Sequence, residues 1–258
     1  MTNTLGYEHM LEIFFDNPLY GDVVCLDEQS PKEASLCADF MDPRIHPVDF
    51  GPSEVIVHPK FGGNDDFGGR QGIKYEYKEE NLKDISPLLL EMNPIHKKIP
   101  VLIHYGKPIS ESLIIVEYID EVWNEKSPLL PTDPYQKSQA KFWGDYIDKK
   151  FYAAGRKVRT SKGEDQENAN KEYIEILKVL KGELGENPYF GGEKFGFVDV
   201  ALIPFYSWFY AYETCGNFSI EEECPKIVSW AKKCMEIECV SQSLPDSGKI
   251  YEFVLTYY

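Results

Sequence analysis

The stretch KKIPVLIHYGKPISESLIIVEYIDEVW, residues 97–123, predicts a β-hairpin followed by a helix. VLIH is an apolar run typical of a buried strand, YGKP is typical of a turn, and PISES contains a second short strand. A helix then begins at Ser110 or Glu111, because the apolar residues that follow recur at helical spacing. The order strand, turn, strand, helix indicates one half of a small α+β domain.

Pro100 lies inside the first strand, where a proline cannot donate a hydrogen bond to a neighbouring strand. An X-Pro bond can be cis at a cost of roughly 0.5–1 kcal/mol. A cis Ile99–Pro100 bond would leave the main-chain N–H and C=O of Ile99 free to pair with an extended peptide. Glu111 and Ser112 begin the helix, where free N–H groups favour an anion, and Lys98 adds a cation. Together these groups suit a short peptide that carries carboxylates.

The length, hydrophobic content and net charge of the chain restrict the class of protein to which it can belong. Its 258 residues suit one large domain or two small ones, and 43% are hydrophobic, enough for a sizeable core. The net charge of −16 argues against nucleic acid and anionic membrane surfaces, which both require basic patches. No apolar stretch approaches the ~18–20 residues of a membrane span, and the N-terminus lacks the basic start of a signal peptide. We expect a cytoplasmic protein.

Cysteine and histidine do not form a metal-binding pattern. The six cysteines include no CxxC motif, and no histidine accompanies the four that lie near the C-terminus. We therefore expect no metal, and reduced, mostly buried thiols.

The composition and the hydrophobic pattern change along the chain. Residues 1–71 are acidic and rich in loops, GIKYEYKEE at 72–80 alternates as a half-buried strand does, and Ser86 with Pro87 begins a short helix. Amphipathic helical patterns then run through 134–159, 165–184, 199–214 and 224–240. These patterns predict an α+β domain over 1–124, with an atypical, extended part at 1–71, and an all-helical domain over 131–258.

NPIHKKIPVLIHYGKPISESLIIVEYIDEVW resembles the glutathione-binding half of a plant tau-class glutathione transferase. The resemblance continues through PLLPTDPYQKSQAKFWGDYIDKKFYAAGRK, YFGGEKFGFVDVALIPFYSWFYAYE and ECPKIVSWAKKC, and covers residues 72 to about 254. It implies a thioredoxin-like N-terminal domain with a divergent first strand and helix, and an all-helical C-terminal domain. It further implies a homodimer that uses glutathione as co-substrate, needs no cofactor, and acts in detoxification and stress response.

The resemblance assigns four glutathione-binding residues. Lys98 matches a lysine that pairs with a glutathione carboxylate, and Ile99 matches the residue whose backbone pairs with the cysteinyl unit. Glu111 and Ser112 match the pair that holds the γ-glutamyl end. The chain departs from the family pattern at Ile85, where the family has a further lysine.

Two serines could activate the glutathione thiol, because the family's usual serine loop is absent. Ser30 follows a predicted strand at 22–27 and opens a predicted helix at 31–41 with the pattern of a capping box. Ser53 lies in a string like the family's, but the glycines that follow argue against a helix there. Ser30 is therefore the leading candidate for the catalytic residue, although it could be a helix cap alone.

The second-substrate pocket should be apolar and aromatic. By resemblance Tyr152, Arg156 and Trp208 match pocket positions, while Arg159 stands where the family has an aromatic residue. Asp199, three residues after Gly196, is typical of a helix cap, and we assign it to folding.

The sequence therefore predicts a glutathione transferase that joins the glutathione thiolate to apolar electrophiles. The alternative is a non-catalytic protein of the same fold that holds ligands or conjugates, because the altered serine loop could weaken activation of the thiol.

Overall fold

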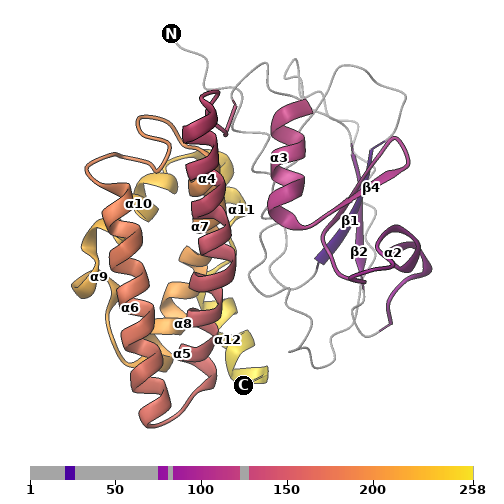
Figure 1. Cartoon of the computed structure of the whole chain (residues 1–258). Coiled ribbons are helices and arrows are strands. Elements are labelled where there is room, and N and C mark those ends of the chain that lie inside the picture. The colour runs from indigo at the N-terminus through magenta and orange to yellow at the C-terminus, as the bar shows by residue number, and fades with distance from the viewer. Residues whose placement is uncertain (1–20, 27–74, 81–83, 123–127, 258) are drawn as a thin grey trace. The chain divides into compact units, whose positions relative to one another are not determined.

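The computed structural model describes residues 21–26, 75–80, 84–122 and 128–257 (Figure 1). The chain divides into two compact units, Met1–Lys126 and Ser127–Tyr258, and each is considered by itself. The first unit contains a sheet, and the described part of the second consists mainly of helices. Among the described helices, none is long and apolar enough to cross a membrane.

A four-stranded sheet forms the centre of the first unit. Its strands are β1 (Gly21–Leu26), β2 (Tyr75–Glu80), β3 (Val101–His104) and β4 (Lys107–Ser110), in the order β2-β1-β3-β4. β1 runs parallel to β3, and the other two pairs are antiparallel. The predicted hairpin is therefore confirmed. The predicted strands at 22–27 and 72–80 are confirmed over their described residues, 22–26 and 75–80.

Among the described residues of the first unit, the helices α2 (Pro87–Met92) and α3 (Ser112–Val122) pack on the sheet, and Figure 1 shows them on opposite sides of β4. Residues of β3 alternate between the two faces, and Val101, Leu102 and Ile103 are all buried. Val101 and Ile103 share a core cluster with Leu89 of α2. Side chains on both faces of β3 are therefore packed in the interior, and this packing holds β3 in place.

Ser86 caps α2 as the sequence predicts. Its hydroxyl oxygen accepts a hydrogen bond from the backbone N–H of Leu89 at 3.1 Å, and Pro87 occupies the first turn. The buried Glu80 in turn accepts from the backbone N–H of Ser86 at 3.1 Å and from its hydroxyl. This chain of contacts ties the start of α2 to the end of β2.

The second unit is helical throughout its described elements. They are α4 (Pro134–Tyr146), a π-helical turn (Ile147–Phe151), α5 (Tyr152–Thr160), α6 (Glu164–Leu184), α7 (Phe197–Leu202), a 3₁₀ turn (Ile203–Phe205), α8 (Tyr206–Gly216), α9 (Ile220–Glu223), α10 (Pro225–Cys234), α11 (Glu238–Ser243) and α12 (Ser247–Tyr257). The helical patterns predicted from the sequence all correspond to helices. Three of these runs are divided in the structure. The π-helical turn separates α4 from α5 within 134–159, the 3₁₀ turn separates α7 from α8 within 199–214, and residues 235–237 separate α10 from α11 within 224–240.

Close packing of α5 on α8 defines the centre of the helical unit. Tyr212 of α8 is buried, and a Cβ atom built on Gly155 of α5 would lie 2.7 Å from the Tyr212 ring. Phe151 and Tyr173 are also fully buried, with ring centroids 5.0 Å apart. The two helices therefore approach closely, because the ring of Tyr212 packs against a glycine, Gly155, which has no side chain.

Asp199 joins three parts of the helical unit. Its fully buried carboxylate accepts hydrogen bonds from the backbone N–H groups of Phe190 (2.8 Å), Gly191 (3.2 Å) and Gly196 (2.8 Å), and from Trp230 Nε1 (2.8 Å). Burial raises the pKa of Asp199 to about 6, so the group is still ionised at neutral pH and can accept all four bonds. The predicted role of Asp199 as a helix cap is confirmed.

Three cysteines of the helical unit are free thiols. Cys224 and Cys234 are buried and Cys215 is partly buried. Burial raises the pKa of each of these thiols, most strongly for Cys234, which lies near Asp199. A raised pKa favours the protonated thiol, which is a weaker nucleophile than the thiolate.

Candidate functional site

Ile99 presents its main chain rather than its side chain. The side chain is only 4% exposed and belongs to the core cluster beneath α2. Within the described residues, its main-chain N–H and C=O have no hydrogen-bond partner. The Ile99–Pro100 bond is cis, as the sequence predicts. Unpaired backbone groups next to a sheet are the groups with which an extended peptide pairs.

Asn93 holds the segment that leads to Ile99. It is 6% exposed and ends α2, where its own N–H donates to the carbonyl of Leu89 at 2.8 Å. Its side-chain Nδ2 donates to the carbonyl of Lys98 at 2.8 Å, and its Oδ1 accepts from the backbone N–H of His96 at 3.2 Å. The five residues after Asn93, residues 94–98, therefore follow a path held by one buried amide side chain.

Glu111 stands at the entrance to α3 in an unusual backbone conformation. Its φ of 75° is in the left-handed region, which residues other than glycine adopt at a cost of roughly 1–3 kcal/mol. Its carbonyl accepts from the N–H of Ile115 at 2.9 Å, in the first turn of α3. Its Oε1 lies 2.5 Å from Nδ1 of His96, and both side chains are about half exposed.

The structure brings four of the predicted site residues to one end of the β3–β4 hairpin. Val101 pairs with Ser110 in the antiparallel register, so Ile99 and Ser112 each lie two residues beyond that pair on the same side. Lys98 precedes Ile99, and Glu111 precedes Ser112. Sequence reasoning missed Asn93 and His96 as members of this group, although an Asn-Pro step after a helix is a signal for a fixed turn.

The remaining predicted residues are placed differently. Ser30 and Ser53 lie outside the described residues. Tyr152 and Arg156 are one turn apart on α5 and both partly buried, so their side chains share a face of that helix. Trp208 on α8 is almost fully buried, and the guanidinium of Arg159 lies 5.2 Å from the centre of its ring. Within the described residues, no group of three or more potential ligands is arranged to hold a metal ion.

Comparison with known proteins supports one family. Residues 70–121 match the family model of the glutathione S-transferase N-terminal domain, and residues 140–238 match that of the C-terminal domain. The chain is 71% identical over 185 residues to the probable glutathione S-transferase parA of Nicotiana tabacum, covering 72% of this chain and 84% of that protein. It is 63% identical over 207 residues to glutathione S-transferase U25 of Arabidopsis thaliana, covering 80% and 91%.

Solved structures agree with these sequence matches. The rice enzyme GST1, solved in complex with glutathione, superposes with a TM-score of 0.67 at 46% identity, covering 69% of this chain and 82% of that one. A tau-class enzyme from mango gives a TM-score of 0.65 at 37% identity, covering 69% and 84%. A thioredoxin-like domain followed by an all-helical domain, with these relatives, defines a glutathione S-transferase.

Within that family the chain belongs to the tau class, as its plant relatives show. The sequence-based expectations of a tau-class transferase, a thioredoxin-like N-terminal domain and an all-helical C-terminal domain are therefore confirmed. The relatives are named as transferases, and none of these matches favours a protein that only holds ligands.

Proposed function

We propose that the chain binds glutathione at the end of the β3–β4 hairpin and joins its sulfur to apolar electrophiles. The observation that carries this proposal is Ile99, whose side chain is buried while its main-chain groups have no partner within the described residues. An extended tripeptide pairs there through its cysteinyl unit. The rice relative, solved with glutathione, supports the same choice of ligand.

The charges around Ile99 match those of glutathione. Glu111 offers a half-exposed carboxylate to the γ-glutamyl ammonium group. Ser112 is the first residue of α3, where the N–H groups and the helix dipole favour the adjacent carboxylate. Lys98, which is partly exposed, supplies a cation for the carboxylate at the other end of the peptide. Backbone pairing sets the position of the tripeptide, and its charged ends set the direction.

The chemistry requires a thiolate. A free cysteine thiol has a pKa near ~8.5, and a hydroxyl donor at a helix N-terminus lowers it. We propose Ser30 as that donor, with Ser53 as the alternative. The thiolate sulfur attacks an electrophilic carbon and forms a C–S bond, while the leaving group departs with the bonding electrons. Tyr152, Arg156 and Trp208 are the proposed contacts for the apolar electrophile.

We also propose a cytoplasmic homodimer. Exposed apolar side chains on α3 (Ile114 and Val122) and α4 (Tyr135 and Phe142) are candidates for burial against a second copy. Sedimentation of the full chain across a range of concentrations measures the oligomeric state, and a monomer throughout would overturn the dimer.

The test of the function separates binding from chemistry. Calorimetry measures the glutathione affinity, and absorbance measures conjugation of 1-chloro-2,4-dinitrobenzene. We expect Lys98→Ala and Glu111→Gln each to weaken glutathione binding about tenfold, equivalent to ~1.4 kcal/mol, while Lys162→Ala in the exposed connection before α6 leaves it unchanged. No glutathione binding by the wild type would overturn the proposal. Binding without conjugation would indicate a protein that only holds its ligand.

A further inference from the structure

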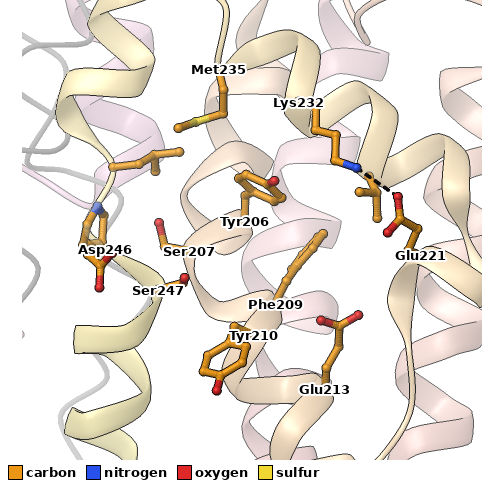
Figure 2. Close-up of a pocket in the computed structure, with 13 residues that line it drawn as sticks. Tyr206, Ser207, Phe209, Tyr210, Glu213, Glu221, Lys232, Met235, Asp246 and Ser247 are labelled. Carbon is orange, nitrogen blue, oxygen red and sulfur yellow. Dashed lines mark hydrogen bonds and ion pairs between the residues drawn. The ribbon is translucent and has the colours of Figure 1, made fainter.

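A cavity in the helical unit involves none of the residues assigned to the proposed function. It lies between α8, α10 and the residues that precede α12, and its volume is about 560 Å³ (Figure 2). Pockets that hold small molecules typically measure ~300–1,000 Å³, so the space suits a compact organic ligand. The chemistry of its wall decides which class of ligand fits.

Aromatic rings of α8 form one part of the wall. Tyr206 and Phe209 lie in perpendicular contact with ring centroids 5.5 Å apart, and Tyr210 is 48% exposed. Met235 and Leu244 add apolar surface. The faces of aromatic rings carry negative electrostatic potential, so a group of rings attracts an organic cation as well as apolar surface.

The charged groups of the wall are mostly acidic. Glu213, Glu221 and Asp246 contribute three carboxylates, and the only lysine or arginine among the lining residues is Lys232. Nζ of Lys232 lies 2.9 Å from Oε1 of Glu221, so that pair neutralises itself. Figure 2 shows Glu213 beside the ring of Phe209 and Asp246 on the opposite side of the cavity. The lining therefore carries a net charge of −2.

The two remaining carboxylates each keep an oxygen for a ligand. Oε1 of Glu213 accepts from the backbone N–H of Ile220 at 2.6 Å, and Oδ1 of Asp246 accepts from the backbone N–H of Lys249 at 3.1 Å. Within the described residues, neither side chain forms an ion pair with a basic group. These backbone contacts hold the two carboxylates in place without cancelling their charge.

We infer that this cavity is a binding site for an aromatic or alkyl ammonium cation. The cationic head lies between the rings of Tyr206 and Phe209 and the carboxylate of Glu213, and the apolar part of the ligand lies against Met235 and Leu244. Asp246 adds a longer-range attraction from the other side. Because the lining is negative, anionic ligands, glutathione among them, are disfavoured at this site.

The test compares three ligands of similar shape on the full-length protein. Ligand-observed NMR measures the affinity for benzyltrimethylammonium, for neopentylbenzene, in which carbon replaces the charged nitrogen, and for the anion phenylmethanesulfonate. We expect the cation to bind about tenfold more tightly than the neutral compound, with an affinity that falls as salt is added. Equal or tighter binding of the neutral compound, or no binding of the cation at about 10 mM, would overturn the site.

Variants locate the binding. Glu213→Gln removes the charge but keeps an oxygen for the N–H of Ile220, and Asp246→Asn keeps a residue that caps helices well. We expect about tenfold weaker cation binding for Glu213→Gln and about threefold for Asp246→Asn, with unchanged binding for Glu183→Gln on the exposed side of α6. Thermal unfolding checks that each variant is folded. If Glu213→Gln does not fold, Asp246→Asn still tests the site.

Wild-type cation affinity in both pocket variants would overturn the inference. Because none of the residues altered belongs to the proposed glutathione site, loss of cation binding should leave glutathione binding intact. Failure of the proposed function would likewise leave this test unaffected.

Discussion

Two carboxylates of this chain, Asp199 and Glu111, differ in their burial and in their hydrogen bonding. Asp199 is fully buried and accepts four hydrogen bonds from donors of its own unit. Glu111 is half exposed, has His96 as its side-chain neighbour, and has a backbone conformation in the left-handed region. A buried carboxylate whose bonds are all made inside the protein specifies the fold. A half-exposed carboxylate at a strained position is more useful to a ligand than to the fold.

The largest expected effect follows removal of the buried carboxylate. Asp199→Ala leaves four donors without their acceptor, two of them in fully buried hydrogen bonds, so the free energy of unfolding should fall by about 3–5 kcal/mol. Chemical denaturation followed by circular dichroism measures this loss. Asp165→Ala, in the exposed first turn of α6, is the matched control and should cost less than about 1 kcal/mol. Similar losses in both variants would mean that the buried bonds are not what distinguishes Asp199.

Two glycines of the helical unit offer a second test, because replacing them with alanine should change stability in opposite directions. Gly155→Ala places a methyl group 2.7 Å from the Tyr212 ring and should destabilise the protein by about 1–3 kcal/mol. Gly182→Ala on α6, where an added Cβ meets nothing within 4 Å, should stabilise it by about 0.5–1 kcal/mol. Thermal or urea unfolding measures both changes. A neutral Gly155→Ala would show that α5 and α8 can move apart without cost.

Asn93 shares features with both carboxylates. It is buried, as Asp199 is, and it holds the segment that carries Lys98 and Ile99 of the proposed site. Asn93→Ala removes the bond to the carbonyl of Lys98 and the bond from the N–H of His96, so stability should fall by about 1–2 kcal/mol. The KM for glutathione should also rise, about tenfold, with little change in kcat, because the segment carrying Lys98 and Ile99 loses its anchor. Asn168→Ala on the exposed face of α6 is the control. An unchanged KM would limit Asn93 to a structural role.

At Glu111 the expected change in stability is a gain. Glu111→Gly relieves the positive φ, and the free energy of unfolding should rise by about 1 kcal/mol. Glutathione affinity should fall by tenfold or more at the same time, because the carboxylate is lost. Denaturation and calorimetry on the same sample measure both quantities. A variant that is more stable and still binds glutathione as the wild type does would remove Glu111 from the proposed site.

Local patterns predicted most of the fold. The caps at Ser86 and Asp199 and the hairpin at 101–110 depend on residues close together in the sequence, so spacing alone revealed them. The π-helical turn at 147–151 has no comparable signal, because helical periodicity is almost unchanged by one wider turn. The sequence therefore predicted one continuous helix where two helices flank that turn.

The proposed glutathione site was predicted only in part. Lys98, Ile99, Glu111 and Ser112 were assigned to it through a motif and a family resemblance, and their role in binding stays a prediction. The contact of His96 with Glu111 joins residues fifteen positions apart, and it depends on the path that Asn93 imposes on the loop. No periodicity encodes such a path. The catalytic serine stays a prediction, since Ser30 and Ser53 both lie outside the described residues.

The buried thiols of the helical unit offer a measure of its motions. Only a thiolate reacts quickly with an alkylating reagent, and Cys224 and Cys234 are both buried and protonated in the folded unit. Alkylation at these positions therefore proceeds through transient opening of α10 and its neighbours. Mass spectrometry of the peptides that contain each cysteine would time that opening residue by residue. The motions of the helical unit can thus be followed in a cell extract, without an engineered probe and without purification.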